Sequence, residues 1–216
     1  MIQPAAPPKS YWDRVAAEKR FSHPLRLDWL GKYSTQQARV LDYGCGYGRT
    51  LAELSLAGFA NFVGVDFSER MLARASLEMP GCRLIRNDGH ALSFKNDCFD
   101  VLLLFAVLTC IPKNDEQLQL MSEAQRVLRP GGIIYVSDLL INEDMRNRRR
   151  YEQYAEAHGC YGVFELPEGV TVRHHRREWI EEIMTPFQHL EFEPFTVTTM
   201  NGNTSAAFQY LGRRPG

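Results

Sequence analysis

The stretch LDYGCGYGRT, residues 41–50, constrains the fold of this 216-residue chain more than any other feature. Three glycines, Gly44, Gly46 and Gly48, stand at alternate positions directly after an apolar run. Glycine has no Cβ atom, so a ligand can lie against the main chain there, and a helix that begins near Thr50 would offer unpaired N–H groups. The spacing indicates either a nucleotide-cofactor site or an ordinary tight turn between a strand and a helix.

Residues 38–140 alternate short apolar runs, typical of buried strands, with longer amphipathic runs, typical of helices. This succession predicts parallel strands joined by crossovers, with helices on both faces of the sheet. Two more strands flank NGNT, a hairpin signal because Asn-Gly tolerates positive φ. We therefore predict an α/β fold with a doubly wound, seven-stranded, mostly parallel sheet and a C-terminal antiparallel hairpin. The strands are expected at residues 38–43, 61–67, 82–87, 99–105, 132–140, 189–200 and 205–214.

The glycine spacing departs from the dinucleotide-binding pattern Gly-x-Gly-x-x-Gly. Counted from Gly44, the third glycine of that pattern would stand where the chain has Arg49. The third glycine comes one residue earlier, at Gly48. A nicotinamide-dependent oxidoreductase is therefore disfavoured, although it stays an alternative.

Acids follow the next two expected strands. In VGVDFS, Asp66 can accept hydrogen bonds from both hydroxyls of a ribose and would repel a 2′-phosphate, and Phe67 can lie against the base. An isolated Asp before Ser68 is also typical of a helix entry. In RNDGHA, Asp88 suits an exocyclic amine, whereas Asp88-Gly89 alone is typical of a turn. With the glycine loop, these acids favour an adenosine-like ligand with a free diol.

Four motifs in order resemble the class I S-adenosylmethionine-dependent methyltransferases. The resemblance covers residues 38–138 and implies a Rossmann-like methyltransferase fold with S-adenosylmethionine as cofactor. The terminal hairpin looks like the antiparallel last strand of that family. The motifs are VLDYGCGYG, VGVDFSERML, NDGHALSFKNDCFDVLLL and AQRVLRPGGIIYVSD.

The resemblance implies a role for each motif residue. Asp42 and the Gly44 main chain would lie near the methionine end of the cofactor, and Gly46 would pass beneath the sugar. Asp66 would hold the ribose hydroxyls, and Asp88 with Gly89 would reach the adenine edge. The cofactor-binding residues expected are Tyr11, Asp42, Gly44, Gly46, Gly48, Asp66, Phe67, Asp88, Gly89 and Phe105.

The segment after the fourth strand, Phe105 to Leu108, would face the sulfonium. Many amide- or amine-methylating relatives carry an Asn-Pro-Pro-Tyr type motif there, and this chain has FAVL. The departure disfavours amide or exocyclic nucleobase nitrogen as the acceptor. Tyr11 and Trp12 either close over the cofactor or pack their helix onto the sheet.

The chain is long enough for one buried core and short for two, so we expect a single domain, residues 1–216. Residues 139–185, the insert, no longer alternate expected strands with expected helices. They are polar and aromatic, which predicts an irregular lid that ends in a helix at 177–184.

Helices are also expected at 10–21, with Ser10 as N-cap, and at 23–33. Ser68 should cap the helix that follows it, and RPGG should break the chain before the fifth strand. The segments are a helical cap (1–35), the cofactor-binding core (36–138), the lid or substrate insert (139–185) and the hairpin (186–216).

Candidate catalytic residues are His174 and His175, which precede the helix in VRHHRREW, and Tyr154 in the insert. For both histidines the alternative is a hydrogen-bonded structural side chain. Cys110 follows the fourth strand. It either lies near the mouth of the site or is a small buried hydrophobic residue. A general base is not required, because positioning alone can be worth ~7–11 kcal/mol whereas a base adds about 3–5 kcal/mol.

Composition limits the partners. The net charge of −1 gives no electrostatic reason to expect nucleic acid, and the longest apolar run, residues 101–111, is well short of the ~20 residues that a membrane helix needs. Five cysteines without a Cys-x-x-Cys pair predict reduced thiols and no metal site. The opening MIQPAAPPKS has no secretory pattern, so a cytoplasmic location is expected. Nothing indicates an oligomeric state.

These observations predict an S-adenosylmethionine-dependent methyltransferase that acts on an oxygen, nitrogen or sulfur nucleophile of a small molecule. The basic run RNRRR, residues 146–150, either attracts an anionic substrate or is a solvated helix face. A protein substrate stays possible. The remaining alternatives are the nicotinamide-dependent oxidoreductase and a non-catalytic cofactor-binding sensor or partner protein.

Overall fold

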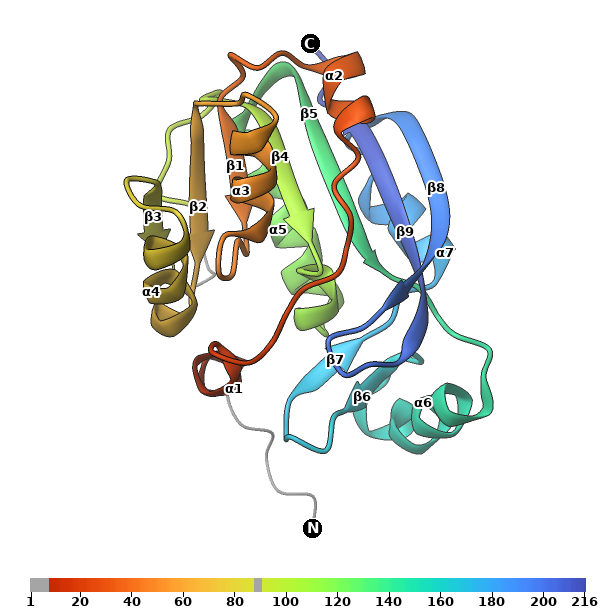
Figure 1. The fold of residues 1–216 in the computed structure, drawn as a ribbon. Helices are drawn as coiled ribbons and strands as arrows, with labels where there is room; N and C mark the ends of the chain where they lie inside the picture. The colour runs from red at the N-terminus through yellow and green to blue at the C-terminus, as the bar shows by residue number, and fades with distance from the viewer. Residues whose placement is uncertain (1–7, 88–90) are drawn as a thin grey trace.

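A seven-stranded sheet forms the centre of the computed structural model, which describes residues 8–87 and 91–216 (Figure 1). The strand order is β3-β2-β1-β4-β5-β9-β8, and the predicted doubly wound α/β fold with its terminal antiparallel pair is confirmed. The strands are β1 (Val40–Tyr43), β2 (Phe62–Asp66), β3 (Arg83–Arg86), β4 (Phe99–Phe105), β5 (Leu128–Leu139), β8 (Gln188–Thr198) and β9 (Thr204–Arg213).

The strand order reverses beside β1, and this reversal positions the site. β1 pairs in parallel with β2 on one side and with β4 on the other. β9 then runs antiparallel to both β5 and β8. Open sheets of this kind bind ligands in the crevice beyond the carboxyl ends of the strands, at the point where the order reverses.

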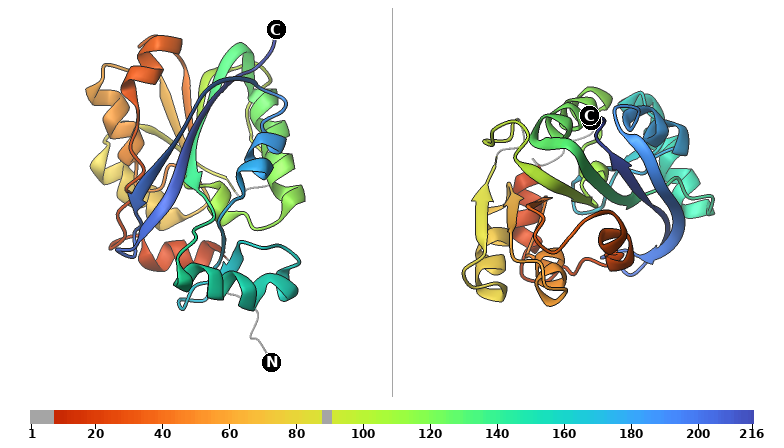
Figure 2. Two further views of the ribbon diagram at one scale, coloured as in Figure 1. Left: turned by 90° about the vertical axis from the view of Figure 1, so that its right-hand side faces the viewer. Right: turned by 90° about the horizontal axis from the view of Figure 1, so that it is seen from above.

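Helices cover both faces because the strands are apolar on both faces (Figure 2). Along β4, Leu102 and Leu104 pack toward α5 and α7, whereas Val101 and Leu103 pack toward α2 and α3. The successive β4 residues point to opposite faces, as strand geometry requires. These helices are α2 (Leu27–Tyr33), α3 (Arg49–Leu56), α5 (Asn114–Val127) and α7 (Arg177–Ile183).

The helix α4 (Glu69–Glu78) begins as predicted. The Ser68 side chain accepts a hydrogen bond from the Met71 N–H at 3.1 Å. The predicted break at RPGG is wrong, because β5 already begins at Leu128 and carries this stretch as an irregularity in its register with β4. Gly131, with φ of +78°, lets the strand continue past the bulge.

The first predicted helix is too long. α1 (Pro8–Val15) ends six residues before Phe21, and Ser10 lies inside it rather than at its cap. Arg74 of α4 explains the early end, since its guanidinium donates to the carbonyl oxygens of Ala16 at 2.9 Å and Lys19 at 3.0 Å. The chain then runs without regular structure to α2.

The insert, residues 139–185, is regular where an irregular lid was predicted. It contains α6 (Met145–His158) and an antiparallel pair of β6 (Val163–Glu165) and β7 (Thr171–Arg173). The Asp144 side chain caps α6, and Gly159, with φ of +61°, ends it. Only Asn147 and Tyr151 of α6 are buried, so its sequence lacks the apolar stripe that marks most helices.

Candidate functional site

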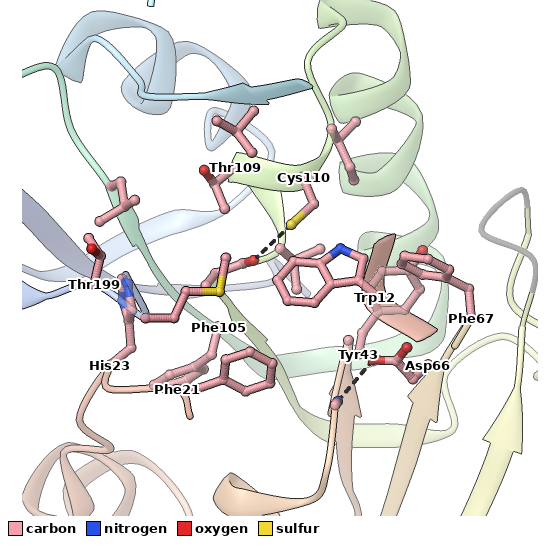
Figure 3. A pocket seen from close by; sticks show the side chains of 18 of the residues that line it. Trp12, Phe21, His23, Tyr43, Asp66, Phe67, Phe105, Thr109, Cys110 and Thr199 are labelled. Atoms are coloured by element: carbon pink, nitrogen blue, oxygen red, sulfur yellow. Dashed lines mark hydrogen bonds between the residues drawn. The ribbon is translucent and has the colours of Figure 1, made fainter. Parts of the chain in front are cut away.

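A cavity of about 520 Å³ lies at the carboxyl ends of β1, β2 and β4 (Figure 3). Residues from each of these strand ends form its floor, including Gly44, Asp66 and Phe105. Three separate parts of the chain cover it. They are the α1 region (Trp12, Phe21, Ser22, His23), the insert (Arg146, Arg150, Phe164, Leu166, Val172, His174) and the turn between β8 and β9 (Thr199, Met200, Asn201, Asn203, Ser205).

The glycine loop holds a conformation that favours glycine at all three positions. The φ angles are +75° for Gly44, +54° for Gly46 and +85° for Gly48. A Cβ at Gly44 would lie 2.6 Å from Val107 Cγ2, and a Cβ at Gly46 would lie 2.4 Å from Phe21 Cε2. Gly44 and Gly46 line the cavity. Gly48 does not; it precedes α3 and faces α4.

Asp66 fixes the glycine loop from the neighbouring strand. Its Oδ2 accepts from the Gly46 N–H at 2.9 Å and its Oδ1 from the Ser68 N–H at 2.8 Å. The side chain is buried yet lines the cavity, and burial raises its pKa. Each carboxylate oxygen has a second lone pair, so the group can still accept a hydrogen bond from each hydroxyl of a diol.

Asp42 is a second buried acid below the loop. Burial raises its pKa to about 7, although Arg49 acts in the opposite direction. Within the described part of the chain, its Oδ2 has no hydrogen-bond partner. The carboxyl does not line the cavity, so it lies behind the glycine main chain rather than on the cavity surface.

Aromatic rings form much of the remaining wall. In Figure 3 the indole of Trp12 projects between Cys110 and Asp66, while Phe21 and Phe67 lie on different sides of it. Tyr11, which was predicted to contact the cofactor, is fully buried and does not line the cavity. Its neighbour Trp12 does, so α1 presents the next residue and uses Tyr11 to pack on the insert.

The cavity includes only one of the three predicted catalytic residues. His174 lines it, but His175 and Tyr154 do not. His175 is fully buried, with its Nε2 2.9 Å from Gln117 Nε2 and its Nδ1 3.1 Å from the Leu139 carbonyl oxygen. Burial lowers its pKa to about 3, so it is a neutral link between elements, which was the structural alternative for this residue.

His174 has two polar neighbours at its Nδ1 atom. The Tyr151 hydroxyl, which accepts from the Asn142 N–H, lies 2.6 Å from His174 Nδ1. Asn142 Nδ2 lies 3.3 Å from the same atom, but its two hydrogens are directed to the Leu140 carbonyl oxygen at 2.8 Å and the Ser205 hydroxyl at 2.9 Å. Burial lowers the pKa of His174 well below its usual value, so the ring is neutral.

Several lining residues gave no usable signal in the sequence. His23, Thr109 and Thr199 come from distant parts of the chain and meet only in the fold. The His23 Nδ1 is 2.9 Å from the Ser137 hydroxyl, and burial lowers the pKa of His23 to about 4. Cys110 also lines the cavity, and burial raises the pKa of its thiol. Asp88 and Gly89, the predicted adenine contacts, lie outside the described residues.

Known proteins share this fold. A family model for a methyltransferase domain matches residues 41–136. A solved S-adenosylmethionine-dependent methyltransferase from Methanosarcina mazei superposes with a TM-score of 0.80 at 24% identity, over 87% of this chain and 97% of that one. Residues 41–136 belong to the methyltransferase-domain family that the model describes. The match favours a methyltransferase over the nicotinamide-dependent oxidoreductase.

Curated relatives within the family differ in what their names say they methylate. A ubiquinone biosynthesis O-methyltransferase from Dechloromonas aromatica is 29% identical over 74% of this chain and 68% of its own length. The EEF1A lysine methyltransferase 4 of Mus musculus is 31% identical over 56% of this chain and 57% of its own. The chain spans about half the length of the first curated relatives it matches.

The residues present fit the family's cofactor. The glycine main chain forms a cradle that a Cβ would obstruct, and the Asp66 carboxylate has spare acceptor capacity beside it. Oδ2 of Asp42 is a buried acceptor still unpaired in the described chain. Within the same described ranges, no helix is long and apolar enough to cross a membrane.

Proposed function

We propose that this chain transfers the methyl group of S-adenosylmethionine to a nucleophilic atom of a small molecule. The observation that carries the proposal is that a single cavity reaches from Gly44 and Asp66 to Thr109 and His174. Donor and acceptor can therefore occupy one space that is closed by the insert. When bound, the cofactor supplies an electrophilic methyl group on a sulfonium.

The cofactor end of the cavity supports specific roles. Asp66 would accept the ribose hydroxyls, and its backbone contacts to Gly46 and Ser68 hold it in place for that task. Gly44 and Gly46 would pass beneath the sugar and the methionine chain, and Phe67 would lie against the base. The roles of Asp88 and Gly89 at the adenine edge stay predictions.

The acceptor end supports positioning rather than proton removal. Burial lowers the pKa of His174, so the neutral ring can hydrogen-bond the acceptor molecule but is a poor base. The insert covers one side of the cavity and would orient the nucleophile, and orientation can be worth ~7–11 kcal/mol. A site that positions the nucleophile but does not remove its proton suits nucleophiles that ionise without help, such as thiols and phenols.

The size and enclosure of the cavity favour a small molecule over a folded protein. A volume of about 520 Å³ lies within the usual range for small-molecule sites. The name of the O-methyltransferase relative agrees with this choice, and the name of the lysine methyltransferase relative keeps a protein substrate as an outcome of the test.

The test has two stages. Calorimetry first measures binding of S-adenosylmethionine and S-adenosylhomocysteine to the full chain. Methyl-labelled cofactor is then incubated with a panel of thiols, phenols, amines and carboxylates, and in parallel with protein extract. Labelled small-molecule product supports the proposal. Binding without any product supports a non-catalytic cofactor-binding protein, and label found only in protein overturns the small-molecule acceptor.

A further inference from the structure

Arg150 is a half-buried cation in the wall of an otherwise largely apolar cavity. Its guanidinium carbon lies 3.8 Å from the centre of the Phe164 ring, which lines the same cavity. One terminal nitrogen donates to the uncharged Asn147 Oδ1. The Nε is buried and, among residues 8–87 and 91–216, has no hydrogen-bond partner. The charge is thus held at the cavity by stacking and by two neutral partners, Asn147 and Tyr151.

The acids near this cation are already engaged elsewhere. Asp144, the N-cap of α6, accepts from the Asn147 N–H at 3.1 Å and lies 3.9 Å from Arg146. The lining acid Glu123 pairs with Arg126 at 2.7 Å, and the lining acid Glu116 pairs with Lys113 at 2.7 Å. In the part of the chain that the structure describes, no ion pair joins a carboxylate to Arg150.

Burial of an unpaired cation is unfavourable, and burial lowers the pKa of Arg150. Arg173 provides a comparison, since it is also buried, stacks over Trp179 and has an unpartnered Nε. Its terminal nitrogen, however, donates to the Pro112 carbonyl oxygen and to Asn114 Oδ1, and it does not line the cavity. Arg150 differs in facing the space where the acceptor would bind.

A neutral imidazole stands beside Arg150. The Phe164 ring that the guanidinium stacks on also meets the His174 ring edge-on, with centroids 5.0 Å apart. The His174 Nδ1 lies 2.6 Å from the Tyr151 hydroxyl, and burial lowers the pKa of the ring. A cation and a neutral imidazole therefore flank one aromatic ring at the acceptor end of the cavity.

Resting on the proposed function, we propose that the methyl acceptor is a small organic carboxylate whose carboxylate group is anchored by Arg150 and His174. The apolar body of the molecule lies against the aromatic wall, and the nucleophile is elsewhere on that body. A planar guanidinium matches a carboxylate in a bidentate contact. Arg146 also lines the cavity, but it is exposed and lies 3.9 Å from Asp144, so Arg150 is the lining cation without a paired acid in the described chain. A carboxylate carries the single negative charge that one such cation neutralises, whereas a phosphate ester carries close to two.

The test measures binding to the full chain saturated with S-adenosylhomocysteine, so that no methyl transfer occurs. Calorimetry compares phenylacetate and octanoate with phenylacetamide and octanamide, and with phenyl phosphate. We expect each carboxylate to bind roughly 10- to 100-fold tighter than its amide, because a hydrogen bond to a charged group is worth about 1.5–3 kcal/mol. Equal binding of carboxylate and amide, or tighter binding of the phosphate, overturns the proposal.

Variants assign the effect to one side chain. Arg150→Met keeps an unbranched side chain without the charge and should abolish the preference for carboxylate over amide. Arg149→Met removes an exposed charge from the same helix and should leave the preference intact. Arg150→Met that still prefers carboxylate overturns the role of Arg150.

Binding of S-adenosylhomocysteine is recorded for every variant and should not change. This measurement separates the two proposals. A chain that binds the cofactor product but ignores carboxylates refutes only the present inference, whereas a chain that does not bind the cofactor product refutes the proposed function and this inference with it.

Discussion

The two ends of the cavity are built from different parts of the chain. At the cofactor end, two neighbouring strands and one loop supply main-chain groups and Asp66, all within residues 43–67. At the acceptor end, side chains arrive from α1, α6, β7 and the β8–β9 turn. A site made of backbone depends on local sequence, and a site made of distant side chains depends on tertiary packing. The first can therefore stay constant across a family while the second changes with the substrate.

The largest effect on cofactor binding should come from obstructing the main-chain cradle of the glycine loop at Gly46. In Gly46→Val, the new side chain would meet Phe21, and φ of +54° is strained for a β-branched residue. We expect S-adenosylmethionine binding to weaken by roughly 100-fold or more. Calorimetry measures this, with Gly31→Ala as the control because a Cβ at Gly31 meets no atom within 4 Å. Equal affinity in both variants would show that the cofactor does not lie against the loop.

The next largest effect on cofactor binding should come from Asp66, the acid at the cofactor end of the cavity. Asp66→Ala removes the acceptor for the ribose hydroxyls, and we expect roughly 10- to 100-fold weaker cofactor binding. Asp100→Ala serves as the control, since Asp100 pairs with Arg39 and Arg129 away from the cavity. Unchanged cofactor affinity in Asp66→Ala, measured by calorimetry, would contradict the ribose role.

A smaller effect concerns the pH dependence of stability. The pKa of Asp42 is about 7 in the folded protein and near 3.8 when unfolded, because burial disfavours the charged form. The favourable contribution of this group is complete below the unfolded pKa and is lost as pH rises toward 7. Asp42→Asn does not titrate, so its free energy of unfolding should fall less between pH 4 and pH 7, by about 1–3 kcal/mol.

Denaturant titrations of both proteins across this pH range give the free energies directly. Asp138, whose pKa burial also raises to about 7, titrates equally in both and cancels in the difference. Parallel pH profiles for the wild type and Asp42→Asn would mean that Asp42 has its ordinary pKa.

The smallest effect separates two tyrosines of α6. Tyr151→Phe removes the hydroxyl that lies 2.6 Å from His174 Nδ1, and we expect a loss of about 1 kcal/mol in stability and a higher KM for the acceptor. Tyr154→Phe should leave KM and kcat unchanged, because Tyr154 does not line the cavity. Chemical denaturation and steady-state kinetics measure these quantities. A large loss of kcat in Tyr154→Phe would instead restore its predicted catalytic role.

The same contrast explains how much of the molecule could be predicted from sequence. The parallel strands, the Ser68 cap and the positions of Gly46 and Asp66 follow from local patterns, since alternation, capping and turn chemistry act over a few residues. The helix α6 could not be recognised, because one buried face with only Asn147 and Tyr151 fully covered gives little periodicity.

Side chains near the acceptor end were harder to place. His174 and His175 are adjacent in sequence, but successive positions of an extended segment point in opposite directions, so only His174 meets the cavity. In the helix α1 the choice between neighbours also failed, because the prediction took Tyr11 whereas Trp12 lines the cavity. Periodicity tells which residues share a face, but only the packed structure tells which face the ligand meets.

The cavity is lined by segments from both ends of the chain, so it cannot be complete until the chain is almost fully synthesised. Trp12 and Ser205 both border the same hollow, although almost the whole polypeptide separates them. A nascent chain that has not yet emerged through β9 can form the glycine loop but lacks the wall that the β8–β9 turn provides. The acceptor end of the cavity should therefore be complete only after translation has passed that turn, whereas the glycine loop of the donor end is synthesised much earlier.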